Sequence, residues 1–303
     1  MTIKFRSFDI PTDIDKVSRF LIETYYAPFT LQSGHINWLP SRWEYMHFHP
    51  LITGVDRSKI GVWEDGDEIA GVVHPEHPGS PAYFEVRPGY ESLKAEMLNY
   101  YEEQIRVTPE GTENHEGIFL MSGDNEFAQI ATDAGYSKSD DTEPMSAVQL
   151  DSVPDSYPIP EGFKLQSLAD DSDPSMVNRV LHRGFNHDGE PPSDGVVERK
   201  FMQSAPNFNS DLNIVAVAPN GDWVSYSGMW HEPTNRYCYV EPVATDPDYR
   251  LMGLGKAAVT ESIRRAKLLG AQISFVGSTQ PIYKSIGFEQ VYSLERWNLT
   301  NAQ

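Results

Sequence analysis

The sequence predicts a mixed α/β fold that occurs twice, once in each half of the chain. Two observations support this prediction. Four landmarks recur in the same order at a nearly constant offset, and strand patterns alternate with helical patterns in both halves. The chain has 303 residues, which is the length of about two domains.

The four landmarks are a strand, a hairpin, a long helix and a short helix with its following turn. Each of them occurs once in each half of the chain. Each hairpin has two apolar-alternating runs around a Gly-Asp turn, the usual pattern of a β-hairpin. The offset between the copies ranges from 160 (163 minus 3) to 152 (282 minus 130). The matched pairs are IKFRSF at 3–8 with FKLQSL at 163–168, 60–76 with 214–232, 86–105 with 245–266, and IATDAGY at 130–136 with IYKSIGF at 282–288.

These matches divide the chain into a first copy at 1–150, a linker at 151–161 and a second copy at 162–303. The last strand of the first copy is expected around Met145–Leu150, before a Pro-rich linker. In the second copy we expect strands at 163–168, 213–218, 223–231, 236–244, 271–276 and 289–299, and helices at 174–186, 194–204, 253–269 and 280–286.

Composition narrows the classes of partner and compartment. The formal net charge of −20 repels phosphate backbones and anionic membranes, so we expect neither nucleic acid nor a membrane as a partner. The charge either steers a cationic substrate or only keeps the protein in solution. One cysteine, Cys238, excludes an internal disulfide. No signal-peptide pattern and no apolar run of ~18 residues are evident, so the expected location is the cytoplasm.

A glycine loop, defined here as residues 250–256 (RLMGLGK), stands between a strand and a long helical pattern. Glycine weakens a helix interior by ~1 kcal/mol relative to alanine, so two glycines here need a reason. The N-terminus of a helix offers unpaired N–H donors, and a glycine lets a bulky anion approach them. The loop therefore predicts a phosphate-binding site, with Arg250 and Lys256 adding positive charge. It lacks both the Walker A and the G-x-G-x-x-G patterns.

The pattern that remains, Arg-x-x-Gly-x-Gly, follows a strand ending in EPVATDP and precedes PIYKSIGF by about 30 residues. At these residues the chain resembles the GCN5-related N-acetyltransferase (GNAT) family. Arg250, Gly253 and Gly255 match its acetyl-CoA motif, and 283–288 matches its Tyr-x-x-x-Gly-Phe motif. The resemblance implies two tandem GNAT-like domains. Each would have a mostly antiparallel sheet flanked by helices, with two strands splayed in a V.

The resemblance also implies how acetyl-CoA, a co-substrate used without a metal, is bound. The backbone of Val243, Ala244 and Thr245 should pair with the pantetheine arm like an added strand. Many relatives carry an asparagine before the short helix, and Ser278 or Thr279 stands in its place here. The N–H groups expected to hold the pyrophosphate are those of Leu251, Met252, Gly253, Leu254, Gly255 and Lys256.

Direct acetyl transfer to an amine needs a base, a polarised carbonyl and an acid for the leaving thiolate. Tyr283 resembles the family's general acid, and the N–H near Ala244 resembles its carbonyl-polarising amide. Strand alternation groups Tyr239, Glu241 and Val243 on one face, so Glu241 is the candidate base or ammonium ligand. His231 and Glu232 are secondary candidates. Cys238 is interpreted as a strand residue, because direct transfer needs no acyl-enzyme.

The first copy is expected to be degenerate. It has Glu91 in place of Arg250, Ala131 in place of Tyr283, and neither glycine of the loop. His35, His47 and His49 lack a full set of metal ligands at familiar spacing, so we interpret them as structural and expect no metal. In the second copy, three acidic residues of the segment 182–195 either attract a cationic amine or are simply solvated. They are Asp188, Glu190 and Asp194.

The predicted function is acetyl-CoA-dependent N-acetyl transfer to the primary amine of a small cationic molecule. Polyamines, aminoglycoside-like compounds and amino sugars fit best, while protein amines and small thiols remain open. The alternative is a non-catalytic acyl-CoA-binding sensor or interaction module. A monomer and a homodimer are both compatible with two fused copies.

Overall fold

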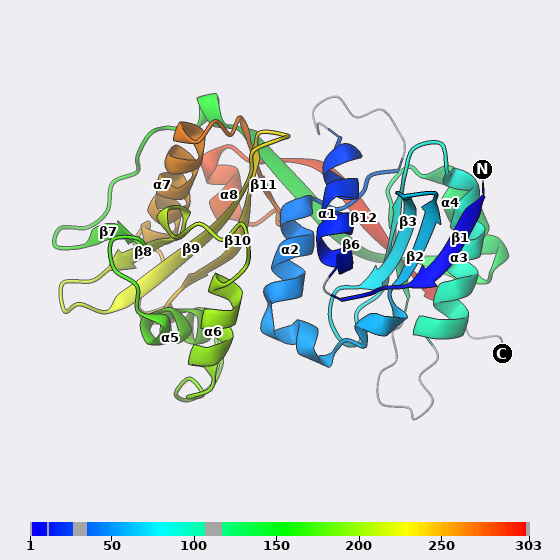
Figure 1. The fold of residues 1–303 in the computed structure, drawn as a ribbon. Helices are drawn as coiled ribbons and strands as arrows, with labels where there is room; N and C mark the ends of the chain where they lie inside the picture. The colour runs from blue at the N-terminus through cyan, green and yellow to red at the C-terminus, as the bar shows by residue number, and fades with distance from the viewer. Residues whose placement is uncertain (1, 11, 27–34, 107–116, 301–303) are drawn as a thin grey trace. The chain divides into compact units, whose positions relative to one another are not determined.

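The computed structural model describes residues 2–10, 12–26, 35–106 and 117–300. The chain folds into two compact units (Figure 1). The first unit comprises 1–47, 51–144 and 291–303, and the second comprises 48–50 and 145–290. Each unit contains one copy of the repeated pattern, as the sequence predicts.

The first unit has a sheet with helices packed on it. Its helices are α1 (Thr12–Glu23), α2 (Pro40–Phe48), α3 (Lys94–Tyr100), continued by a π-helical turn η5 (Tyr101–Ile105), and α4 (Asn125–Asp133). Its strands are β1 (Ile3–Ser7), β2 (Gly61–Asp65), β3 (Glu68–Pro75), β4 (Ala82–Val86), β5 (Ile118–Met121), most of β6 (Tyr136–Gln149) and most of β12 (Glu289–Leu299). Their order in the sheet is β1-β2-β3-β4-β5-β12-β6.

The second unit repeats this arrangement. Its helices are α5 (Pro174–Gly184), α6 (Gly195–Gln203), α7 (Leu254–Leu268) and α8 (Pro281–Ile286), with a short turn η8 (Pro247–Tyr249). Its strands are the end of β6, β7 (Lys164–Ser167), β8 (Ile214–Val217), β9 (Trp223–Glu232), β10 (Tyr237–Thr245) and β11 (Ile273–Val276). Their order is β6-β11-β10-β9-β8-β7, and only β10 and β11 run parallel within this set.

The helices of the second unit cover both faces of its sheet (Figure 1). Along β8, Val215 and Val217 pack in the cluster that contains α5 residues, while Ala216 packs in the cluster that contains Leu254 of α7. Successive strand residues point to opposite faces, so α5 and α7 lie on opposite sides of the sheet. The site described below lies where both helices meet the end of β10.

The two units divide the chain differently from the boundaries read in the sequence. β12, at the end of the second copy, pairs with β5 of the first unit, with Leu294 opposite Met121. The end of β6 pairs instead with β11 of the second unit, with Gln149 opposite Ile273. Each copy therefore gives its last strand residues to the sheet of the other unit, and residues 145–150 and 291–303 change sides. Local sequence patterns report a strand but not its pairing partner, so this exchange could not be read from them.

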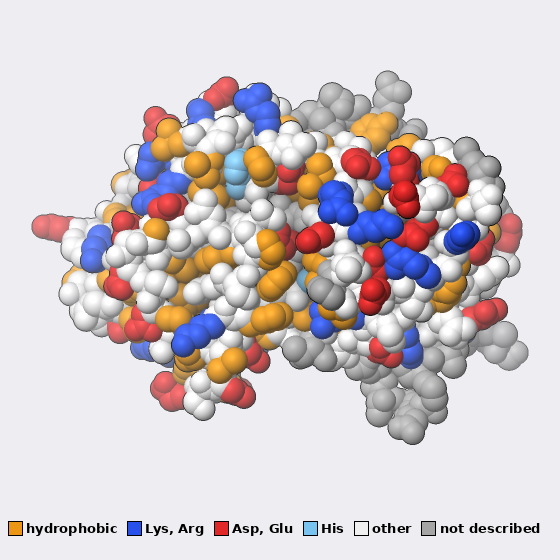
Figure 2. Space-filling view, viewed as in Figure 1, with side chains coloured by type: hydrophobic (Ala, Val, Ile, Leu, Met, Phe, Trp, Pro, Cys, Tyr) orange, Lys and Arg blue, Asp and Glu red, His pale blue; other side chains and the backbone are white. Residues whose placement is uncertain are grey.

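None of the helices in the described ranges is both long and apolar enough to cross a membrane. The charges on the face in Figure 2 are mixed, with Lys and Arg side chains lying among Asp and Glu side chains. The large negative total therefore does not produce a surface of one sign on that face.

Candidate active site

The strand β10 separates from its neighbour β11 part-way along its length. The two strands pair only from Tyr237 to Tyr239, opposite Ile273 to Phe275. Beyond this point β10 continues to Thr245 and stays paired with β9 on its other side. The edge of β10 that faces away from β9 is therefore outside the β10–β11 ladder in its second half. This is the splay that the sequence resemblance predicts.

A bulge in β10 sits at the start of the splay. The pairing with β9 shifts between Val240 and Val243, and Gly228 of β9 lies against the bulged residues. A Cβ at Gly228 would lie 2.4 Å from the carbonyl oxygen of Glu241, so only glycine fits there. The indole N–H of Trp230 donates to the same carbonyl oxygen at 3.0 Å. The backbone of Glu241 is thus fixed from β9.

Because of this bulge, the strand alternation assumed from the sequence is wrong for Val243. Val243 packs in the same apolar cluster as Cys238 and Val240, whereas simple alternation placed it with Tyr239 and Glu241. An extra residue in a bulge reverses the faces of all residues that follow it. Simple alternation therefore does not assign the face on which the Glu241 side chain lies.

The glycine loop ends in an uncapped helix N-terminus. Gly253 is the N-cap residue of α7, with a φ of +82°, and no side chain bonds to the first N–H groups of the helix. Leu251 also has a positive φ, +63°, and its side chain is fully exposed. A left-handed backbone favours glycine at 253. The loop therefore presents backbone N–H groups and the positive end of the helix dipole, which suits an anionic group.

Gly255 has a different reason to be glycine. A Cβ at this position would lie 3.0 Å from Oγ1 of Thr245 and 3.3 Å from Cδ1 of Ile282. Thr245 is held in place by a 2.9 Å hydrogen bond between its hydroxyl and that of Ser225. Gly255 thus lets the first turn of α7 approach the end of β10 closely, where the sequence suggested only room for a phosphate.

The two cations predicted to help bind phosphate both have protein partners. Arg250 donates to the carbonyl oxygens of Thr245 at 3.2 Å and Gly184 at 2.8 Å, and to Oδ1 of Asn186 at 2.8 Å. The ammonium of Lys256 donates to the carbonyl oxygen of Ser285 at 2.7 Å and lies 3.8 Å from the ring centroid of Tyr157. Arg250 therefore fastens the glycine loop to the end of α5.

A second arginine that sequence reasoning missed strengthens the same junction. Arg183 of α5 pairs with both oxygens of the buried Asp246 and donates to Asp248 at 2.7 Å. The hydrogen bond from Arg183 lowers the pKa of Asp246. Asp246 directly follows β10, so Arg183 and Arg250 tie α5 to both ends of the turn that precedes α7. The one available signal was the acidic pair Asp246 and Asp248, which appears in the sequence as an ordinary turn.

Tyr283 packs beside the splayed strand and lies within electrostatic range of Glu241. Tyr283 of α8 is 8% exposed and packs in the cluster that contains Val240, with Val243 at its margin. Burial raises the pKa of the Tyr283 phenol, and the charge of Glu241 raises it further. The phenol is therefore protonated at neutral pH, and a carboxylate lies within electrostatic range of it.

Two of the remaining sequence candidates, Ser278 and Glu232, accept local backbone hydrogen bonds. The hydroxyl of Ser278 accepts from the N–H of Gln280 at 3.2 Å, just before α8. Glu232 accepts from the N–H groups of Thr234 at 2.8 Å and Asn235 at 2.6 Å, so it closes the β9–β10 turn. His231 is half-buried, and burial lowers its pKa.

Three further expectations can be compared with the structure. Burial raises the pKa of Cys238 to about 12, so its thiol is not ionised at neutral pH. Asp188, Glu190 and Asp194 are all exposed. Among the described residues, no group of three or more His, Cys, Asp or Glu is placed to hold a metal ion.

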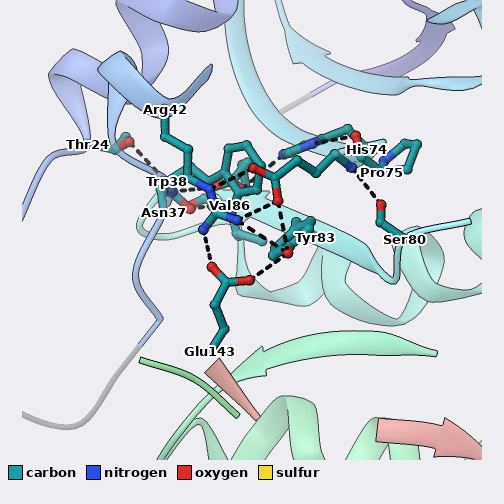
Figure 3. A network of polar contacts seen from close by, with 12 residues as sticks. Thr24, Asn37, Trp38, Arg42, His74, Pro75, Ser80, Tyr83, Val86 and Glu143 are labelled. Carbon is teal, nitrogen blue, oxygen red and sulfur yellow. Dashed lines mark hydrogen bonds and ion pairs between the residues drawn. The ribbon is translucent and has the colours of Figure 1, made fainter. Parts of the chain in front are cut away.

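In the first unit, the end of the matching strand is already occupied by a side chain of the same unit. β4 pairs with β5 only at Ala82 opposite Ile118, so these strands also splay. The amide of Asn37 donates to the carbonyl oxygen of Val86 at 3.0 Å and accepts from its N–H at 2.7 Å (Figure 3). By the sequence match, Val86 corresponds to Thr245, whose strand end is predicted to pair with pantetheine. Asn37 makes the two hydrogen bonds that an added strand would make.

The matching helix N-terminus in the first unit has a buried lysine and no glycine. Lys94, the first residue of α3, is 2% exposed, and its ammonium lies 2.9 Å from Asp124, the N-cap residue of α4. His35 lies 3.3 Å from the same carboxylate. Glu91 accepts from Gly89 N–H at 2.9 Å in the preceding turn. The side chain of Lys94 is thus turned to the N-cap of α4, and the loop before α3 has no counterpart of Gly253 or Gly255.

A buried charge cluster lies beside Asn37 in the first unit (Figure 3). The guanidinium of Arg42 lies 3.8 Å from the ring centroid of Trp38 and pairs with Glu76 at 2.7 Å and with Glu143. Tyr83 donates to Glu143 at 2.7 Å. The pKa of Glu76 is lowered because attraction to Arg42 outweighs burial. These groups satisfy one another, which makes the cluster structural.

The geometry of the second unit agrees with a comparison to known families. A family model described as the acetyltransferase (GNAT) family matches residues 181–288, from the end of α5 to the end of the Tyr-x-x-x-Gly-Phe motif. This part of the chain is a GNAT domain. No curated protein sequence gave a match.

Solved structures extend the likeness of the fold to both units. A GCN5-related N-acetyltransferase from Sphaerobacter thermophilus is 15% identical, with a TM-score of 0.63, over 97% of this chain and 94% of that one. A tandem GNAT protein from the clavulanic acid biosynthesis pathway is 14% identical, with a TM-score of 0.58, over 100% of both chains. A GNAT-family acetyltransferase from Colwellia psychrerythraea is 12% identical, with a TM-score of 0.58, over 98% and 100%. The chain thus has the fold of a tandem GNAT protein with a degenerate first copy.

Proposed function

We propose that the second unit transfers the acetyl group of acetyl-CoA directly to a primary amine. The observation that carries the proposal is the splayed half of β10, with the buried Tyr283 packed beside it and the glycine N-cap of α7 following it. GNAT membership supports acyl transfer in general, and the amine acceptor is the more specific part of the proposal.

The residues present fit acetyl-CoA, which would supply the activated acetyl group. Donors for its pyrophosphate are the N–H groups of the glycine loop from Leu251 to Lys256. The segment of β10 from Val243 to Thr245, which lies outside the β10–β11 ladder, offers backbone groups for the pantetheine arm. Arg250 would act by holding this loop against Gly184 and Thr245, because its guanidinium already binds their carbonyl oxygens.

In the proposed reaction Glu241 takes a proton from the acceptor ammonium, directly or through one water. The neutral amine forms a C–N bond with the acetyl carbon and gives up a second proton to solvent as the C–S bond breaks. A backbone N–H near Ala244 stabilises the oxygen that gains charge. Tyr283 gives its proton to the leaving sulfur and is later reprotonated from solvent.

The two side chains reinforce each other in this scheme. Burial raises the pKa of the Tyr283 phenol, and the charge of Glu241 raises this pKa further, which makes the phenol a weaker acid before the reaction. Once Glu241 holds the proton of the amine, that charge is gone and the phenol becomes a stronger acid. Uptake of a proton at the base therefore favours release of a proton at the acid.

We further propose that the reacting amine arrives as a cation on a small molecule. The negative total charge of −20 and the carboxylate of Glu241 both attract an ammonium group. Polyamines, aminoglycoside-like compounds, amino sugars and amino acids all carry such a group.

Release of free thiol from acetyl-CoA, measured against polyamines, aminoglycosides, amino sugars, amino acids, small thiols and peptides, tests the proposal. Turnover with one class of amine supports it. If only thiols give turnover, the acceptor is a thiol and the proposal of an amine acceptor is wrong. If acetyl-CoA raises Tm but no acceptor gives turnover, the protein functions as a CoA-binding module. In that case a cellular phenotype would survive the double change Tyr283→Phe and Glu241→Gln but not Gly255→Arg.

A further inference from the structure

A small pocket lies between α5 and α6 in the second unit. It has a volume of about 250 Å3. The residues that line this α5–α6 pocket come from the end of α5, the loop that follows and the start of α6. They are Asn178, Leu181, His182, Phe185, His187, Pro192, Gly195, Glu198 and Arg199. A pocket of this size suits one small group rather than a large molecule.

The α5–α6 pocket lies beside the end of β10. Leu181, in its wall, packs in the same apolar cluster as Ala244. One helical turn further, a Cβ at Gly184 would lie 2.6 Å from Cβ of Ala244 and 3.0 Å from the N atom of Thr245. The helix that forms one wall of the pocket thus touches the residues proposed to meet pantetheine.

One hydrogen-bond donor of Arg199, its Nε–H group, has no acceptor among the described residues. The Nε atom is also buried. By contrast, Arg183 and Arg250 in the same region are both bonded to acceptors of the chain. A buried donor without an acceptor costs about 1–3 kcal/mol, so the site favours an occupant that supplies one.

The other groups of the pocket define the occupant. A guanidinium binds a carboxylate through two parallel hydrogen bonds. The apolar side chains of Leu181, Phe185 and Pro192 can pack against carbon atoms. The one carboxylate in the lining, Glu198, is exposed, whereas Arg199 is partly buried and its Nε is fully buried.

We propose that the α5–α6 pocket binds the carboxylate of the acceptor, with Arg199 as its counter-ion. The acceptor is then a small amino acid or a related zwitterion, with a reacting amine and a separate acidic group. This inference rests on the proposed function and makes its substrate class narrower, because it favours amino acids over polyamines and amino sugars. Arg199 is a specificity residue in this account and takes no part in proton transfer.

The test compares amino acids with their own carboxamides, which keep the amine and lose the negative charge. Binding is measured by calorimetry with CoA present, so no turnover is needed, and kcat and KM are measured in parallel with acetyl-CoA. The expected result is at least ~10-fold tighter binding of the acids. Arg199→Gln should remove this preference, Arg199→Lys should restore part of it, and Lys200→Gln, an exposed position on the same helix, should leave it unchanged.

Two results would overturn the inference. Equal binding of acids and amides by the unaltered protein would exclude a carboxylate site. A rise in KM for acetyl-CoA in Arg199→Gln, with acceptor binding unchanged, would assign the charge to a phosphate of the cofactor. A different result would show that the proposed function is wrong while the carboxylate site is correct. In that case the acids would bind in an Arg199-dependent way, but no acetyl transfer would occur.

Discussion

Glu241 of β10 lies close enough to Tyr283 of α8 for its charge to raise the pKa of the phenol. The two residues are separated by 42 positions (283 minus 241) and come from different elements. Glu241 lies in the bulge of β10, and Tyr283 packs in the same apolar cluster as Val240 of that strand. This relationship is measurable without knowing the acceptor.

Glu241→Gln should lower the pKa of the Tyr283 phenol. Removing a nearby negative charge favours the phenolate, while the effect of burial remains. The measurement is NMR titration of the protein labelled at tyrosine Cζ, with Tyr283→Phe to assign the signal. Glu161→Gln, an exposed position in the linker, is the control. An unchanged phenol pKa in Glu241→Gln would mean that the carboxylate does not act on Tyr283.

Gly253→Ala should weaken acetyl-CoA binding by more than its effect on stability explains. Both Gly253 (φ +82°) and Gly221 (φ +92°), which lies in the β8–β9 turn, have left-handed backbones with no close neighbour within 3.4 Å of an added Cβ. Alanine at either position should cost a similar ~1–2 kcal/mol of unfolding free energy. Thermal unfolding and calorimetry with acetyl-CoA compare the two variants. Equal affinity in both would remove the glycine loop from the binding site.

One molecule of acetyl-CoA should bind per chain. The first unit has the amide of Asn37 on the backbone of Val86, and the buried Lys94 with neither loop glycine at the start of α3. Asn37→Ala should cost about 1–3 kcal/mol, because it leaves two buried backbone groups unpaired. It should not create a second site, since Lys94 remains. A calorimetric stoichiometry near two in the unaltered protein would contradict this account of the first unit.

His47→Leu should stabilise the first unit, and more so in acid. Both ring nitrogens of His47 are buried without a partner among the described residues, and burial lowers its pKa from 6.5 to about 3. The unfolded chain therefore binds a proton between these pH values that the folded chain does not. His47 therefore does not lower the free energy of unfolding further above pH 6.5. Below pH 6.5 this free energy falls progressively, until the folded histidine also takes up a proton near pH 3.

Urea unfolding at pH 7.5 and pH 5 measures this effect. The His47→Leu variant should lose about 2 kcal/mol less than the unaltered protein between the two pH values, since 1.5 pH units lie below the ordinary pKa. His77→Leu, at an exposed position of the same unit, should show no such difference. An equal pH dependence in His47→Leu would mean that His47 can take up a proton in the folded state.

The elements of the second unit could be predicted closely because their signals are local. The apolar stripe from Leu254 to Leu269 predicted a helix at 253–269, and α7 runs from Leu254 to Leu268. The motif around Gly253 and Gly255 predicted an uncapped helix N-terminus beside a strand end. Propensity, periodicity and turn residues act over a few positions, so one sequence is enough to read them.

The features that escaped prediction depend on contacts between distant positions. The pairing of β12 with β5 joins segments more than 170 residues apart, from Met121 to Leu294, and no local pattern names a partner strand. Asn37 meets Val86 across 49 positions. The Nε of Arg199 lacks an acceptor among the described residues. This could not be predicted, because it depends on which groups of the folded chain surround the atom. The bulge at Glu241 reversed the predicted faces because one inserted residue shifts all that follow.

The most direct test of the central claim is the effect of Tyr283→Phe on turnover of the best acceptor. The account predicts a fall in kcat of at least ~100-fold, with unchanged KM for acetyl-CoA and nearly unchanged Tm, because the ring stays and only the proton donor is lost. Tyr136→Phe, which removes a buried hydroxyl without a partner among the described residues of the first unit, should keep full activity. If Tyr283→Phe retains the kcat of the unaltered protein across the pH range, Tyr283 is not the general acid and the proposed mechanism is wrong.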